Sequence, residues 1–168
     1  LTVKAPKGWK VFSNAPTPTP EEEGEAWVYR FATTEVMSTY ITAIVAGPYE
    51  GTTATLTSSD GRTIDLGVYA RSSILEHLDA DEIIEITRQG FEFFEGAYGI
   101  AYPFTKYDQI FVPEYNAGAM ENAGCVTFRD AYVFRTRPTE AQMEARANTI
   151  LHELAHMWFG DLVTMKWW

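Results

Sequence analysis

The chain of 168 residues is 46% hydrophobic and 14% aromatic, which suffices for one packed domain or for parts of two. Thirteen basic against twenty-three acidic side chains give a formal net charge of −10, which argues against nucleic acids and anionic membranes as partners. No apolar run reaches the length of a membrane span. The one cysteine, Cys125, cannot form an intramolecular disulfide and is expected to be a small buried side chain, so we expect a cytoplasmic protein.

The first seventy residues predict β structure. Short runs rich in Val, Ile, Tyr, Phe and Thr are bounded by turn residues, and Asp60-Gly61 between the last two runs is a hairpin signal. Residues 16–23, with three prolines and three glutamates, predict an exposed loop. The predicted strands are residues 8–13, 26–33, 39–46, 52–58 and 63–70.

A helix followed by two strands is predicted after this β-rich part. Asp79, with Glu82 three positions later, has the spacing of a capping box. Apolar residues then recur at helical spacing, and Gly99 is placed to end the helix. The strands predicted next are residues 107–115 and 124–134.

The last segment predicts a long helix over residues 140–159. Thr139 and Gln142 have the spacing of a capping box, and Gly160 is placed to stop the helix. An apolar stripe should pack this helix against the rest of the domain. The stripe consists of Ala147, Leu151, Leu154 and Trp158.

This helix carries the pentapeptide His152-Glu153-Leu154-Ala155-His156. Residues four apart lie on one helix face, so both imidazoles can bind one zinc ion at about 2.0–2.1 Å. Glu153 lies beside them and suits a base that takes a proton from a zinc-activated water. The apolar stripe packs the helix without the histidines, so packing does not explain their presence. Two histidines at metal-binding spacing with a glutamate beside them indicate a zinc hydrolase. His77 has no such companions and predicts no site.

A second motif, Gly118-Ala119-Met120-Glu121-Asn122, stands with its Glu121 thirty-one residues before His152. Together with the metal motif it resembles the aminopeptidase N family of zinc metallopeptidases, of the bacterial, actinobacterial type. The similarity runs along the whole chain and includes Ser38-Thr39-Tyr40. Either motif alone is moderately specific, whereas the two in this order and separation are very specific.

The resemblance implies roles for the site residues. His152 and His156 would be ligands of one zinc ion, and Glu153 the general base. Glu121 would bind the α-ammonium group of a peptide with a free N-terminus, which a fixed carboxylate near the metal can do. The peptide would lie along Gly118 and Ala119, in the substrate-binding segment that continues through Met120 to Asn122, where Asn122 orients the loop.

The resemblance also implies an α+β fold. Residues 1–72 would be the C-terminal part of an N-terminal β-saddle domain, and residues 73–168 the N-terminal part of a thermolysin-like zinc peptidase domain. The family's third zinc ligand, a glutamate nineteen positions after His156, would fall at position 175, beyond the last residue. Because the chain also starts without methionine or signal peptide, both ends are expected to be cuts. The remainder of the catalytic domain is then an expected partner, and the piece alone should hold zinc weakly and have little activity.

Three alternatives stay open beside the aminopeptidase. A thermolysin-like endopeptidase is disfavoured by Glu121, which would hinder binding of a chain that continues past the site. An epoxide hydrolase–peptidase relative usually has a different glycine motif. A non-catalytic scaffold or fragment is favoured by the short ligand set, since catalytic zinc sites normally have three protein ligands. One departure from the family is Asp161, which stands where many relatives have asparagine. It is expected to lie outside the ligand set and to modify the properties of a histidine of the metal-binding helix.

Overall fold

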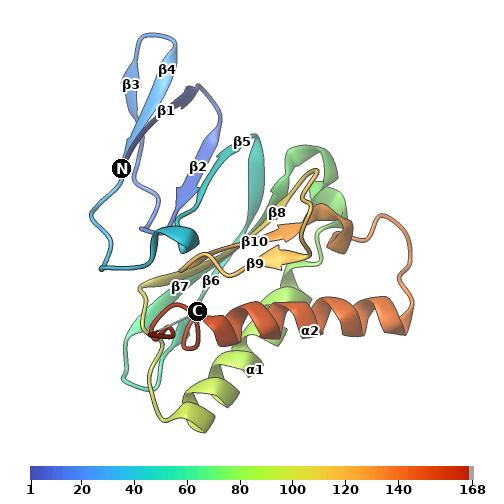
Figure 1. Cartoon of the computed structure of the whole chain (residues 1–168). Helices are drawn as coiled ribbons and strands as arrows, with labels where there is room; N and C mark the ends of the chain where they lie inside the picture. The colour runs from blue at the N-terminus through green and yellow to red at the C-terminus, as the bar shows by residue number, and fades with distance from the viewer. Residues whose placement is uncertain (167–168) are drawn as a thin grey trace.

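Residues 1–166 are described by a computed structural model, in which three β-sheets and two α-helices form layers (Figure 1). This mixture of sheets and helices is compatible with the predicted class of the fold. Within the described residues, no helix combines the length and the apolar character that a membrane crossing requires. The two smaller sheets have the orders β1 (Thr2–Pro6), β4 (Ala26–Arg30), β3 (Glu21–Glu23), and β2 (Lys10–Ser13), β5 (Ile44–Gly47).

A five-stranded mixed sheet forms the centre of the molecule. Its order is β6 (Tyr49–Thr57), β7 (Thr63–Arg71), β8 (Lys106–Val112), β10 (Cys125–Arg129), β9 (Ala119–Met120). β6 and β7 form the predicted hairpin, β8 runs parallel to both of its neighbours, and β9 pairs antiparallel with β10 at the edge of the sheet. Because β7 pairs with β8, the sheet contains residues from both sides of position 72, and the domain division there stays a prediction.

Strands β8 and β10, in the middle of the central sheet, are buried on both faces, to which alternate residues point, whereas the edge strand β6 is mostly exposed. One face packs against the two helices, and the other packs against β2 and β5 through residues such as Ile110. Cys125 belongs to the second face, where it is free and fully buried as predicted, and burial raises the pKa of its thiol to about 11. The helix-facing residues include Ile64, Leu66, Val68, Tyr107, Phe111, Val126 and Phe128.

Helix α1 (Ala80–Tyr98) begins without the predicted capping box. The Asp79 side chain makes no capping hydrogen bond. Asp79 and Glu82 instead accept hydrogen bonds from Nη2 of Arg146 at 3.0 and 2.9 Å, which draws both carboxylates away from the helix backbone. The helix ends at Gly99 as predicted, where the backbone adopts φ of 65°.

Arg146 is the buried cation that joins the two helices. Its side chain is 1% exposed, and its guanidinium lies 4.6 Å from the centre of the Phe134 ring. We expect Arg146→Ala to lower the free energy of unfolding by about 2–4 kcal/mol, because Asp79 and Glu82 lose their shared cation. Chemical denaturation measures this change, with exposed Arg137→Ala as the control. A loss under about 0.5 kcal/mol would contradict this role.

Helix α2 (Glu140–His156) begins at the predicted capping box. The Gln142 backbone N–H donates to the Thr139 hydroxyl oxygen at 3.3 Å, and the Thr139 N–H donates to the Gln142 side-chain oxygen at 2.8 Å. The helix ends at His156, three residues before the predicted end, because the next backbone N–H groups switch to closer carbonyls. Met157 N bonds to Leu154 O, for example, at 3.1 Å.

The buried face of α2 includes only part of the predicted stripe. Leu154 and Trp158 are buried as predicted, and Ile150 is fully buried as well. Ala147 and Leu151 keep partial exposure. Gly90 of α1 permits this approach, because a Cβ atom there would lie only 2.7 Å from methyl groups of Leu151 and Leu154. The end of α2 is thereby held against α1, while the two histidines of the metal motif keep more exposure than Glu153 and Leu154.

Residues 39–46 do not form one strand as predicted. A 3-10 turn, η1 (Thr39–Ile41), comes first, and β5 begins only at Ile44. The buried side chain of Asn14 explains the difference, because it bonds to the Ile41 carbonyl at 2.8 Å and to the Ala43 N–H at 3.0 Å. A side chain therefore satisfies backbone groups that a neighbouring strand would otherwise pair with.

Other predicted boundaries were also wrong. Part of the predicted loop is the edge strand β3, whose glutamates pair across the sheet; Glu23, for example, lies 2.8 Å from Lys4. β1 was not predicted. The predicted strands at 107–115 and 124–134 end early, because the backbone of Glu114 is left-handed with φ of 51° and a 3-10 turn, η3 (Asp130–Tyr132), follows β10.

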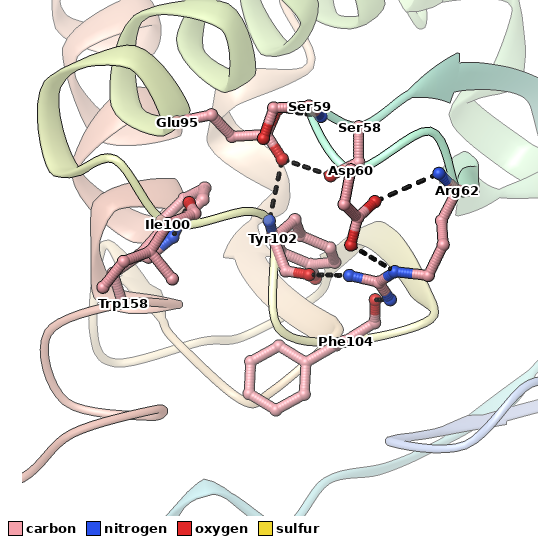
Figure 2. A network of polar contacts seen from close by, with 9 residues as sticks. All are labelled: Ser58, Ser59, Asp60, Arg62, Glu95, Ile100, Tyr102, Phe104 and Trp158. Carbon is pink, nitrogen blue, oxygen red and sulfur yellow. Dashed lines mark hydrogen bonds and ion pairs between the residues drawn. The ribbon is translucent and has the colours of Figure 1, made fainter.

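Two buried networks hold the loop between α1 and β8 (Figure 2). Glu95 at the end of α1 accepts hydrogen bonds from Ser59 N at 2.8 Å and Tyr102 N at 2.7 Å, which ties the loop to the β6–β7 turn. The indole N–H of Trp158 donates to the Ile100 carbonyl at 2.9 Å. The same loop therefore supports the chain just after the metal motif.

Candidate metal centre

The two histidines of α2 point at one another across one helical turn. Their Nε2 atoms lie 3.1 Å apart and their ring centres 4.7 Å apart, with ring planes at 82°. Neighbouring nitrogens of a tetrahedral zinc ion with bonds of about 2.0–2.1 Å lie roughly 3.3–3.4 Å apart. The spacing of His152 and His156 is therefore close to that of a shared metal ion.

A backbone carbonyl orients the second imidazole. Nδ1 of His156 lies 2.9 Å from the Phe159 carbonyl oxygen, which can only accept, so Nδ1 carries the proton. The Nε2 atom of the neutral ring then presents a lone pair, as a metal ligand must. Gly160 makes room for this arrangement, because a Cβ atom there would lie 3.2 Å from Nδ1, and its φ of 127° favours glycine.

Glu153 lies on the inner side of the histidine pair. Its side chain is 5% exposed, and its Oε2 atom is buried without a hydrogen-bond partner among residues 1–166. Burial, and secondarily the charge of Glu121, raise the pKa of this carboxyl to about 7. A group near pKa 7 can both take and release a proton at neutral pH.

The sheet edge brings Glu121 to the same place. Donor atoms of Glu121, Glu153 and His156 all lie within 4.8 Å of one another, although Glu121 follows β9 and the other two belong to α2. Figure 1 shows α2 running alongside β9. The side chain of Asn122 points inward and donates to the Thr127 hydroxyl at 3.2 Å, which is a loop-orienting contact. The structure thus joins the two sequence motifs.

Gly118, Ala119 and Met120 form the outer edge of the sheet beside these side chains. Ala119 and Met120 pair with Phe128 and Thr127 of β10 on one side only, because β9 is the last strand. The Gly118 carbonyl accepts a hydrogen bond from Arg129 N at 3.0 Å. The opposite edge of β9 has no strand partner within the described residues, so an extended peptide can pair there.

A third carboxyl group, that of Asp161, lies behind the site. Both of its carboxylate oxygens are buried and have no hydrogen-bond partner in the part of the chain that the structure describes. Burial and the charges of Glu121 and Glu153 raise its pKa to about 8. Nδ1 of His156 is already bound by Phe159, so the prediction that Asp161 tunes a histidine does not hold for that atom.

These side chains fit a cation. Donor atoms of Glu121, Glu153 and His156 lie together, and the Nε2 atom of His152 lies 3.1 Å from that of His156. Neither Lys nor Arg contributes to the pKa of Glu153 or of Asp161. Buried oxygens without partners, in Glu153 and Asp161, add to this negative site. Imidazole and carboxylate donors are those that zinc accepts.

Asp161 should make the stability of the metal-free chain depend on pH. Its folded pKa, about 8, exceeds the ordinary value of an aspartate, which is about 3.9, so its contribution is present at low pH and is lost as pH rises from that ordinary value to 8. We expect Asp161→Asn to stabilise the metal-free chain by about 1–2 kcal/mol at pH 9 and little at pH 4. Denaturation at the two pH values measures this, and an equal effect at both would contradict it.

Two tyrosines near the site were not predicted from the sequence. The hydroxyl of Tyr107 is buried without a partner among the described residues, and the charges of Glu153 and Asp161 act on it. Tyr40 lies at the end of α2, where its hydroxyl donates to the Gly160 carbonyl at 3.3 Å, and the charge of Glu121 acts on it. Both reach the site only through tertiary contacts, and the one signal in the sequence was the resemblance around Ser38-Thr39-Tyr40.

Comparisons with known proteins show which family the chain belongs to. Residues 82–168 match the model of the Peptidase family M1 domain, which is more than half of the chain. The chain belongs to peptidase family M1. This M1 chain is 59% identical to aminopeptidase N of Streptomyces lividans over all of its 168 residues, which are 19% of that protein.

Two further relatives of the M1 chain are more distant. The tricorn protease-interacting factor F2 of Thermoplasma acidophilum is 40% identical over 169 aligned positions, covering all of this chain and 20% of that protein. Aminopeptidase N of Mus musculus is 36% identical over 149 positions, covering 88% of this chain and 15% of that protein. The chain thus spans about a fifth or less of the curated relatives that it matches.

Proposed function

We propose that the protein that carries this sequence is a zinc-dependent aminopeptidase, which removes N-terminal residues from peptides. The observation that carries the proposal is the convergence of Glu121 from the sheet edge on Glu153 and His156 of α2, within 4.8 Å. A metal-binding helix alone is common to many hydrolases. A carboxylate fixed beside it, on the edge where a peptide would lie, suits recognition of a free amino terminus.

Each side chain has a proposed task. His152 and His156 hold the zinc ion through their Nε2 atoms. Bound zinc supplies Lewis acidity toward water and toward the peptide carbonyl group. The buried Oε2 of Glu153 takes a proton from the attacking water and delivers it to the leaving amine nitrogen. Glu121 holds the α-ammonium group, and its charge limits binding to peptides that begin at that point.

The peptide would lie along β9. An extended chain beside Gly118, Ala119 and Met120 can continue the central sheet by one strand, because β9 offers an edge. Such pairing orients the first peptide bond toward α2. Together with the charge of Glu121 beside this edge, it makes peptides with a free N-terminus the proposed substrate class.

The wider architecture of the protein is part of the proposal. We assign residues 1–72 to the end of a β-saddle domain and residues 73–168 to the first part of a thermolysin-like domain. A catalytic zinc ion normally has three protein ligands, and the family resemblance puts the third at position 175. The 168-residue chain alone is then expected to bind zinc weakly, with the remainder of the catalytic domain as its partner.

One comparison of substrates tests the proposal. A polypeptide of the length of the relatives, carrying these 168 residues, should hydrolyse leucyl-anilide with zinc bound and lose this activity when a chelator removes the metal. Nα-acetyl-leucyl-anilide should not be hydrolysed. Hydrolysis of an N-acetylated internal peptide bond at a comparable rate would favour the endopeptidase. Zinc-loaded protein that hydrolyses neither substrate would favour a scaffold.

A further inference from the structure

The N-terminal β part contributes a third wall to the site, beside β9 and α2. Asn14, after β2, is buried and bonds through Nδ2 to the Ile41 carbonyl at 2.8 Å and to the Ala123 carbonyl at 2.9 Å. Ala123 lies two residues after Glu121. One side chain therefore fixes the η1 turn against the loop that carries Glu121.

Tyr40 projects from this turn toward the end of α2. Its hydroxyl donates to the Gly160 carbonyl at 3.3 Å, and a Cβ atom on Gly160 would lie 3.3 Å from the hydroxyl and 3.2 Å from Nδ1 of His156. Tyr40 is 48% exposed, so it borders open space and not the core. The pKa of Tyr40 is raised, first by partial burial of its hydroxyl group and then by the charges of Glu121 and Asp161.

The hydroxyl of Tyr40 donates its one proton to the Gly160 carbonyl, and the charge of Glu121 acts on this hydroxyl. A substrate ammonium group has three N–H donors and needs more than one acceptor. Because the tyrosine proton is donated to the Gly160 carbonyl, the lone pairs of the hydroxyl oxygen remain as acceptors for an ammonium group bound to Glu121.

We propose that Tyr40 is a second substrate-binding residue, whose hydroxyl oxygen accepts a hydrogen bond from the α-ammonium group held by Glu121. This inference rests on the proposed aminopeptidase function. It assigns part of amine recognition to the β-rich half of the chain. Asn14 is then a positioning residue, since it holds the η1 turn and the Glu121 loop together.

Two hydroxamates that differ only in the amine test this role. Leucine hydroxamate and 4-methylpentanohydroxamate share the side chain and the metal-binding group. The inhibition constant of the amine-free compound divided by that of leucine hydroxamate therefore reports what the amine contributes to binding. In the zinc-loaded, full-length protein, Tyr40→Phe should raise the inhibition constant of leucine hydroxamate by about tenfold, because a hydrogen bond to a charged group is lost. The inhibition constant of the amine-free compound should stay the same.

Tyr29→Phe is the matched control, because it removes a hydroxyl of the same β-rich part that donates to the Trp9 carbonyl at 2.6 Å, away from the site. Glu121→Ala is the reference for loss of the main amine ligand. An unchanged ratio in Tyr40→Phe, with a lowered ratio in Glu121→Ala, would overturn the role of Tyr40 alone. Equal weakening of both compounds would also overturn it, because that is the sign of a structural role. If wild-type protein itself does not distinguish the two compounds, the proposed function fails first.

Discussion

Replacing Glu153 by glutamine is expected to lower kcat by about 10²–10⁴-fold for aminoacyl-anilides. Glutamine keeps the size of the side chain and cannot accept a proton at neutral pH. Glu153, which follows His152 in the sequence, is buried, and its Oε2 atom has no hydrogen-bond partner among the described residues, so the carboxylate is not engaged elsewhere through that atom. Steady-state kinetics with zinc-loaded, full-length protein measures the change.

The zinc content of Glu153→Gln decides how this loss is interpreted. We expect it to equal that of the wild type, because the proposed ligands are the two histidines, and metal analysis after dialysis measures it. Glu144→Gln is the matched control, since Glu144 is an exposed carboxylate on the same helix. Kinetics that stay within threefold of the wild type would refute the role of Glu153 as base, and loss of zinc would make it a ligand instead.

Replacing Glu121 by alanine is expected to lower kcat/KM for substrates with a free amine by roughly 100-fold, mainly through KM. The substrate ammonium group would lose its charged partner, Glu121. Neither Lys nor Arg affects the pKa of Glu153 or of Asp161, so the charge of Glu121 is not offset there by a basic side chain. Paired assays of leucyl-anilide and its Nα-acetylated form measure the change. Discrimination between the two substrates should shrink by a similar factor.

Glu121→Gln separates the charge of this side chain from its size. Glutamine fills the same volume beside β9, so it should show most of the loss seen with alanine if the charge binds the amine. Discrimination that survives in both variants would show that another group recognises the free N-terminus. The Glu121 variants should also lower the pKa of Glu153, because the charge of Glu121 raises it in the structure.

The two motifs of the site could be predicted from local sequence, and their meeting could not. Helical spacing alone puts His152 and His156 on one face, and the structure has their Nε2 atoms 3.1 Å apart. Residues 118–122 have no such periodicity. Their placement at the sheet edge depends on β10, which pairs with β9 on one side and β8 on the other.

Predicted boundaries and caps were wrong where a side chain distant in the sequence formed the hydrogen bonds that a local partner was expected to form. Asn14 replaced a strand partner for residues around η1, and Arg146 took over the two carboxylates that were expected to cap α1. Each partner lies more than 25 positions away in the sequence, so no local pattern contains it. The Thr139 capping box, which involves neighbours only, was predicted correctly.

The sequence by itself determined the turn of α2 that carries His152 and His156, the β-rich first part of the chain and the burial of Cys125, because these depend on residue types at short spacings. It also contained the two motifs by which the chain resembles a peptidase family. Only the tertiary structure decided that Glu121 and Tyr40 reach the histidine pair and that Glu153 and Asp161 have raised pKa values. Those properties depend on burial and on distances between elements, which arise when the sheet edge, the η1 turn and α2 pack together.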